Sequence, residues 1–123
     1  MSCSIDFSFL ISVYKNDSSI YFDEALNSLL TQERLPDQVV LVCDGPLSDS
    51  LESIISKYSQ LFLASNIEFI NPRLEHNLGL GDALKYGVTF CTKAYIVRMD
   101  SDDVSLPNRT KLLEQFLIQN INI

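Results

Sequence analysis

Three carboxylates stand within four residues at Asp100-Ser101-Asp102-Asp103, directly after a short apolar segment. Like charges this close disfavour one another at pH 7 unless a positive group joins them. Ligands that are all oxygen favour Mg²⁺ or Mn²⁺ over zinc. Such an ion commonly takes its remaining ligands from water and from substrate phosphates. The cluster therefore predicts a divalent metal site that serves a phosphorylated ligand.

A structural interpretation of the same cluster is an Asp-rich turn that caps the helix expected near Pro107. A calcium loop fits less well, because the EF-hand pattern requires Gly at its sixth position, which is Ser105 here. The cluster ends the fourth strand-like segment of the chain, and this context favours a binding site over a capping turn.

Strand-like and helix-like segments alternate along the chain. Short apolar runs predict four strands, at residues 7–13, 39–43, 67–70 and 94–99. Helical spacing of apolar residues follows each run, over about 18–33, and from about 49, 79 and 107 onward. This order predicts an α/β fold with a Rossmann-like, mostly parallel sheet and helices on both faces.

The ends of the helices carry their own signals. Ser18 or Ser19 is expected to cap the first helix, and Asp49 with Glu52 resembles a capping box at the second. Parallel strands bring their carboxyl ends to one edge of a sheet, where ligands of such folds bind. The polar residues after the predicted strands should therefore converge there: Tyr14, Asp44, Asn77 and the Asp100 cluster.

Bulk composition narrows the class of protein. The 123 residues are 46% hydrophobic and 20% charged, which suits one globular domain. A formal charge of −7 argues against nucleic-acid binding through a basic surface. Cys3, Cys43 and Cys91 lack CxxC spacing and are expected to be reduced thiols in the cytoplasm. The N-terminus does not resemble a signal peptide, and no apolar run reaches the length of a membrane span.

The segment from Arg98 to Asp103, followed by Leu106-Pro107-Asn108-Arg109, resembles the DxD segment of family 2 glycosyltransferases. Other segments resemble further landmarks of that family in the same order: residues 9–14, 22–32, 39–45 and Asn77-Leu78-Gly79 with Ala83 and Gly87. The likeness covers nearly the whole chain, and it is greatest to bacterial enzymes of exopolysaccharide and O-antigen synthesis, including the amylovoran type. It implies a GT-A fold.

The resemblance implies a nucleotide-binding role for six residues, of which five lie outside the acidic cluster. Tyr14 would stack on or flank the base, and Ser12 would contribute its backbone or hydroxyl. Asp44 would accept a hydrogen bond from uracil or ribose, which favours a UDP-sugar over guanosine or thymidine donors. Asn77 and Gly79 would lie along the path of the ribose and diphosphate.

The remaining roles concern the acidic cluster. Asp100 would hold the ribose or the sugar, and Asp102 would be the direct ligand of Mn²⁺ or Mg²⁺, with Asp100 as its partner in the metal site. Asp103 is expected to support the loop. Outside the cluster, Arg98 is expected to pair with a site carboxylate, to bind phosphate or to form an internal salt bridge. Arg73 is a candidate to face the base, and His76 is expected to face solvent.

For the activity, the resemblance implies inverting, metal-dependent transfer of a sugar from a nucleotide diphosphate to a saccharide or lipid-linked acceptor, in cell-surface polysaccharide synthesis. The family places its catalytic base in a second half. We find no candidate base and expect it beyond residue 123, so residues 1–123 are expected to be a single nucleotide-sugar-binding domain of a truncated, inactive enzyme. The alternative is a non-catalytic binding module or scaffold.

The expected location is the cytoplasm, at the inner face of the plasma membrane if the full-length enzyme associates with it. The sequence does not decide whether the protein forms a homo-oligomer. A receiver domain of bacterial signalling fits poorly, because Asn71-Pro72-Arg73 stands after the third strand where a phosphoacceptor aspartate is required. A nucleotidyltransferase would need a glycine-rich, lysine-bearing first loop, which this sequence lacks. NAD binding would need a third glycine after Gly79-Leu80-Gly81.

Overall fold

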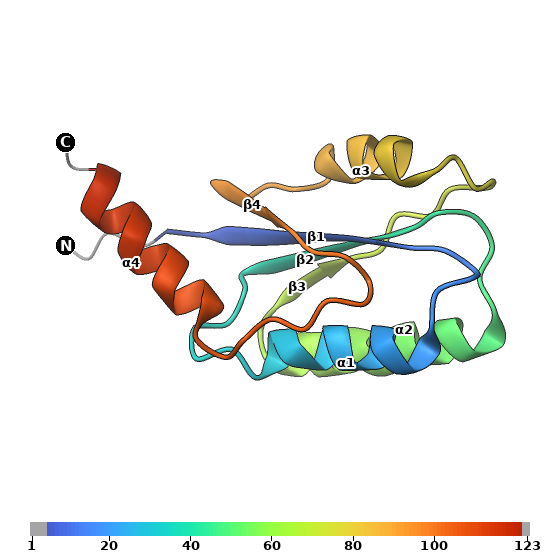
Figure 1. Ribbon diagram of the computed structural model, residues 1–123, viewed down its shortest axis with the longest axis horizontal. Coiled ribbons are helices and arrows are strands. Elements are labelled where there is room, and N and C mark those ends of the chain that lie inside the picture. Colours follow the sequence, from blue (N-terminus) through green and yellow to red (C-terminus); the bar gives the residue numbers. More distant parts are fainter. Residues whose placement is uncertain (1–4, 122–123) are drawn as a thin grey trace.

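The computed structural model describes residues 5–121, so the prediction for Cys3 lies outside the described residues. Four strands form one parallel sheet in the order β3-β2-β1-β4 (Figure 1). Their bounds are β1 Phe7–Val13, β2 Gln38–Cys43, β3 Glu68–Ile70 and β4 Tyr95–Arg98. Helices follow the strands in alternation: α1 Ser19–Leu30, α2 Asp49–Ala64, α3 Leu80–Val88 and α4 Arg109–Ile121.

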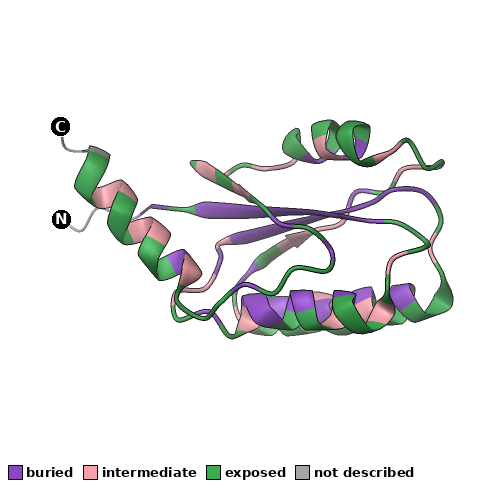
Figure 2. Cartoon of the chain, in the orientation of Figure 1, coloured by how far each residue is buried: buried purple, intermediate pink, exposed green. Residues whose placement is uncertain are grey.

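Helices lie on both faces of this sheet, which confirms the predicted α/β architecture. Helices α1 and α2 cover one face, and α3 covers the other (Figure 1). Strands β1 and β2 lie in the middle of the sheet and are buried along their whole length (Figure 2). This burial on both faces explains why their sequences are almost continuously apolar.

Alternate residues of the central strands supply two separate cores. The side chains of Phe7, Phe9, Ile11 and Val13 pack with α1 and α2. Leu10 packs on the other face, together with Val40, Val42 and Ala83. Helix α3 approaches this face closely, because a Cβ at Gly87 would lie 2.5 Å from the Cδ1 of Leu10.

Several predicted boundaries differ from the structure. Ser18 caps α1 as expected, with its side chain accepting a hydrogen bond from the Tyr21 amide. The capping box at Asp49 and Glu52 is wrong, because Ser48 is the N-cap of α2 and accepts from the amide of Leu51. The edge strands β3 and β4 are shorter than predicted. Among residues 5–121, no helix is long and apolar enough to cross a membrane.

Helix α1 ends three residues before its predicted end because tertiary hydrogen bonds replace its last turn. The Glu33 amide donates to the Pro107 carbonyl at 2.7 Å. Gln32, which is 5% exposed, donates from Nε2 to the carbonyls of Leu106 at 2.7 Å and Ser105 at 3.2 Å. Its Oε1 accepts from both the amide and the hydroxyl of Thr110, each at 3.0 Å. One buried side chain thus connects α1 to the segment between the acidic cluster and α4.

We expect Gln32→Met to lower the free energy of unfolding by about 2–4 kcal/mol, because it leaves buried polar groups of Thr110 and Ser105 without partners. The matched control is Gln60→Met on the exposed side of α2, where we expect little change. Urea denaturation of the three proteins measures the difference. Equal stability of the two variants would contradict the structural role of Gln32.

Candidate functional site

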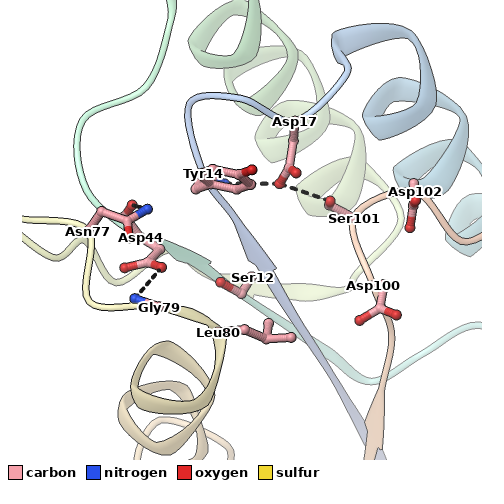
Figure 3. Close-up of a pocket in the computed structure, with 10 residues that line it drawn as sticks. All are labelled: Ser12, Tyr14, Asp17, Asp44, Asn77, Gly79, Leu80, Asp100, Ser101 and Asp102. Carbon is pink, nitrogen blue, oxygen red and sulfur yellow. Dashed lines mark hydrogen bonds between the residues drawn. The ribbon is translucent and has the colours of Figure 1, made fainter.

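A cavity of about 320 Å³ opens at the carboxyl edge of the sheet. Its size falls in the range of about 300–1,000 Å³ that is typical of small-molecule sites. Ten residues from four loops and strand ends line it (Figure 3): Ser12, Tyr14, Asp17, Asp44, Asn77, Gly79, Leu80, Asp100, Ser101 and Asp102. Asp44, Asn77 and Gly79 lie on one side of the cavity and Asp100 with Asp102 on the other, with Ser12 and Leu80 between them (Figure 3).

Strand register explains why these residues meet. Val13 of β1 lies beside Cys43 of β2, so Tyr14 and Asp44 leave the sheet at the same level. The Asp44 amide donates to the Val13 carbonyl at 2.8 Å and holds that level. On the other side of β1, Leu10 lies beside Arg98, and the Met99 amide donates to the Leu10 carbonyl at 3.0 Å. Asp100 therefore emerges level with Ser12, in the same cavity.

The structure brings together every residue that the sequence predicted for nucleotide and metal binding. These are Ser12, Tyr14, Asp44, Asn77, Gly79, Asp100 and Asp102. Their roles toward a nucleotide stay predictions. Sequence reasoning missed Asp17, Leu80 and Ser101. The signal for Asp17 was its place just after the first strand, and Ser101 stands between two predicted site residues.

Asp44 holds one side of the cavity. It is 4% exposed, and its carboxylate accepts hydrogen bonds from the amides of Leu78 at 2.8 Å and Gly79 at 3.1 Å. Its carbonyl accepts from the side-chain amide of Asn77 at 3.4 Å. These bonds fix the start of α3, where Gly79 is the N-cap with φ 97°. Backbone amides thus stabilise the buried negative charge of Asp44, which has no cationic partner among residues 5–121.

The acidic cluster has a different environment because its three carboxylates are exposed. Ligand atoms of Asp100, Asp102 and Asp103 all lie within 4.8 Å of one another. Asp103 accepts a hydrogen bond from the Asp100 amide at 3.2 Å, which agrees with a role in supporting the loop. Asp100 pairs with Arg98 at 3.1 Å. Within residues 5–121, the Asp102 carboxylate has no hydrogen-bond or ion-pair partner. An oxygen-only group with this spacing fits Mg²⁺ or Mn²⁺.

Two other polar residues considered from sequence do not line the cavity. Arg73 makes two bonds to Glu52, of 2.7 and 2.8 Å, and its role toward a base stays a prediction. The Arg73 guanidinium lowers the pKa of Glu52 by hydrogen bonding. His76 lines a neighbouring hollow of about 210 Å³ together with Lys15, and it is exposed as expected.

The cavity carries an unbalanced negative charge. Four of its lining residues are aspartates, and none of the ten is Lys, Arg or His. A diphosphate that enters this cavity would meet electrostatic repulsion unless a cation accompanied it. The charge of the site therefore favours either a cation or a ligand whose anionic part is bound through one.

Comparison with known proteins agrees with this fold. The family model described as glycosyl transferase family 2 matches residues 8–121, and the chain belongs to this family. An amylovoran biosynthesis glycosyltransferase of Erwinia amylovora, AmsE, is 40% identical over 84% of this chain and 37% of the relative. An Escherichia coli UDP-Gal:alpha-D-GlcNAc-diphosphoundecaprenol beta-1,3-galactosyltransferase is 34% identical over 93% of this chain and 40% of the relative. The chain thus spans about two-fifths of the length of these curated relatives.

Among solved structures, Staphylococcus aureus TarS 1–349 in complex with UDP superposes with a TM-score of 0.80 at 26% identity. The match covers 95% of this chain and 33% of that structure. The fold is therefore GT-A, as the resemblance implied.

We expect Gly79→Ala to destabilise the protein by about 1–3 kcal/mol, because φ 97° is strained for any residue with a Cβ. Gly81→Ala is the matched control two residues later in α3. No atom lies within 4 Å of its added Cβ, and alanine favours the helix, so its stability should be unchanged or slightly higher. Thermal unfolding compares the two, and equal melting temperatures would refute the strain at Gly79.

Proposed function

We propose that this chain is the donor-binding part of a glycosyltransferase that uses a nucleotide diphosphate sugar, with a UDP-sugar favoured. The observation that carries the proposal is Asp102. It is the one cavity carboxylate without a protein partner among residues 5–121, in a cavity with no basic lining residue. A cation held by Asp102 and Asp100 would offset this charge and allow a diphosphate to bind beside it.

The two sides of the cavity suit the two ends of such a donor. Tyr14 is 38% exposed and can offer its ring to a base. Asp44 and the 77–79 loop would border the base and ribose, and Asp100 the ribose or sugar. TarS is solved with UDP and with UDP-GlcNAc, and the E. coli relative is named for UDP-Gal, which supports uridine as the base.

The reaction proposed for the whole protein is inverting transfer to a saccharide or lipid-linked acceptor in cell-surface polysaccharide synthesis. The acceptor oxygen bonds to the anomeric carbon as the bond to the diphosphate breaks, and a base takes the hydroxyl proton. A bound Mn²⁺ or Mg²⁺ would supply positive charge that offsets the charge of the diphosphate. We place the base beyond residue 123, and the protein in the cytoplasm, at the inner face of the plasma membrane when the acceptor is lipid-linked.

Calorimetric titration with UDP, with and without Mn²⁺, tests the donor site. We expect binding that depends on Mn²⁺, and Asp102→Ala should weaken it at least about tenfold because it removes a direct ligand. Glu24→Ala removes another exposed carboxylate, from α1 and outside the cavity, and should leave the affinity unchanged. Failure of the unsubstituted protein to bind UDP in Mn²⁺ would refute the proposal.

A non-catalytic nucleotide-sugar-binding module is the second candidate. The observation in its favour is that three of the four cavity carboxylates already have protein partners. Asp17 and Asp44 each accept two hydrogen bonds, and Asp100 pairs with Arg98. Asp102 would hold the proposed cation. None of them is left to act as a base.

We therefore expect the 123-residue chain to bind UDP without releasing UDP from UDP-glucose, UDP-galactose or UDP-GlcNAc when Mn²⁺ and a saccharide acceptor are present. A coupled assay for released UDP measures this against a protein-free control. Turnover that disappears in Asp102→Ala would show that a base lies within these residues, and it would overturn our assignment of the base to a later segment.

A further inference from the structure

Asp17 joins the loop after β1, which carries Tyr14, to the segment of the acidic cluster. It lies in the loop between β1 and α1, and its Oδ2 accepts a hydrogen bond from the Tyr14 amide at 3.0 Å. The same oxygen accepts from the hydroxyl of Ser101, also at 3.0 Å, across 84 residues of sequence (Figure 3). The Asp17 amide donates back to the Tyr14 carbonyl at 3.0 Å, which closes the loop on itself.

Ser101 is oriented for this contact. It is only 9% exposed, whereas Asp100 and Asp102 on either side of it are exposed. The Ser101 side chain therefore points toward Asp17, while the carboxylates on either side of it are exposed. A serine hydroxyl can donate one hydrogen bond, and here Asp17 accepts it. Replacement of either partner by alanine removes the side-chain bond between the two loops.

We propose that Asp17 is a positioning residue that sets the distance between Tyr14 and the acidic cluster. This inference rests on the proposed function, in which Tyr14 contacts the base and Asp100 with Asp102 holds a cation beside the diphosphate. A ligand that touches both sides of the cavity requires the correct spacing. A ligand that touches only one side does not.

The test therefore compares UDP with uridine. In Mn²⁺, Asp17→Ala should weaken UDP binding about five- to twentyfold, as expected for loss of hydrogen bonds to a charged group. Uridine, which lacks the diphosphate, should change by less than about twofold, because Tyr14 and Asp44 remain. Ser101→Ala should reproduce the selective loss. Both substitutions break the same hydrogen bond, so their effects should not add. The double variant should therefore bind UDP as tightly as the single variant with the lower UDP affinity.

Asp17→Asn separates positioning from charge. Its amide oxygen can accept from both the Tyr14 amide and the Ser101 hydroxyl, but the negative charge is gone. A positioning role predicts UDP affinity equal to that of the unsubstituted protein, or slightly higher because one anion leaves the cavity. A role for Asp17 as a cation ligand predicts a loss as large as that of Asp17→Ala.

The outcomes distinguish this inference from the function on which it rests. If the unsubstituted chain does not bind UDP in Mn²⁺, both the proposed function and the role of Asp17 are refuted. If it binds but the single losses add in the double variant, only the bridge is refuted. Equal weakening of uridine and UDP, or loss of affinity in Asp17→Asn, also refutes it. Should Asp17→Ala fail to fold by circular dichroism, Ser101→Ala with Asp17→Asn still decides the question.

Discussion

The position of the site residues depends on the hydrogen bonds that strand β1 makes to its neighbours. It forms hydrogen bonds with a parallel strand on each side, and both of its faces are buried. The Val13 carbonyl accepts a hydrogen bond from the Asp44 amide after β2, and the Leu10 carbonyl accepts one from the Met99 amide after β4. One strand therefore positions both sides of the cavity. A shift of one residue in either pairing would move the side chains of the shifted strand to the opposite face of the sheet, and the two separate cores on the faces of β1 oppose this.

Two of the four cavity carboxylates accept hydrogen bonds from neutral donors, and Asp100 pairs with Arg98. Asp44 is stabilised by two backbone amides and Asp17 by one amide and one hydroxyl. These neutral donors satisfy the carboxylates but leave their charge in place. Their negative charge is therefore available to a cation, and Asp102 is the cavity carboxylate that has no partner among residues 5–121. This division between satisfied and unsatisfied carboxylates matters more for the chemistry of the site than the number of aspartates.

Much of this arrangement could be predicted from sequence because it depends on local patterns. The apolar runs of β1 and β2 identify buried parallel strands, and the first polar residue after each, Tyr14 and Asp44, is found in the cavity. The misses share another cause. The end of α1 depends on Gln32 and Glu33 bonding to residues more than 70 positions away, and Glu52 pairs with Arg73 instead of closing a capping box. Asp17 shows its contact with Ser101 only once the loops are folded together.

The segment that carries the acidic cluster is held at two points and exposed between them. Ser101 is tied to Asp17, and the Ser105 amide donates to the Ser28 hydroxyl at 3.0 Å while Gln32 binds the Ser105 carbonyl. Asp102, Asp103 and Val104 lie between these anchors and face solvent. Fixing a loop before a ligand arrives removes ordering entropy from the cost of binding. The buried serines and Gln32 therefore belong to the site as much as the aspartates do, because they determine where the exposed carboxylates stand.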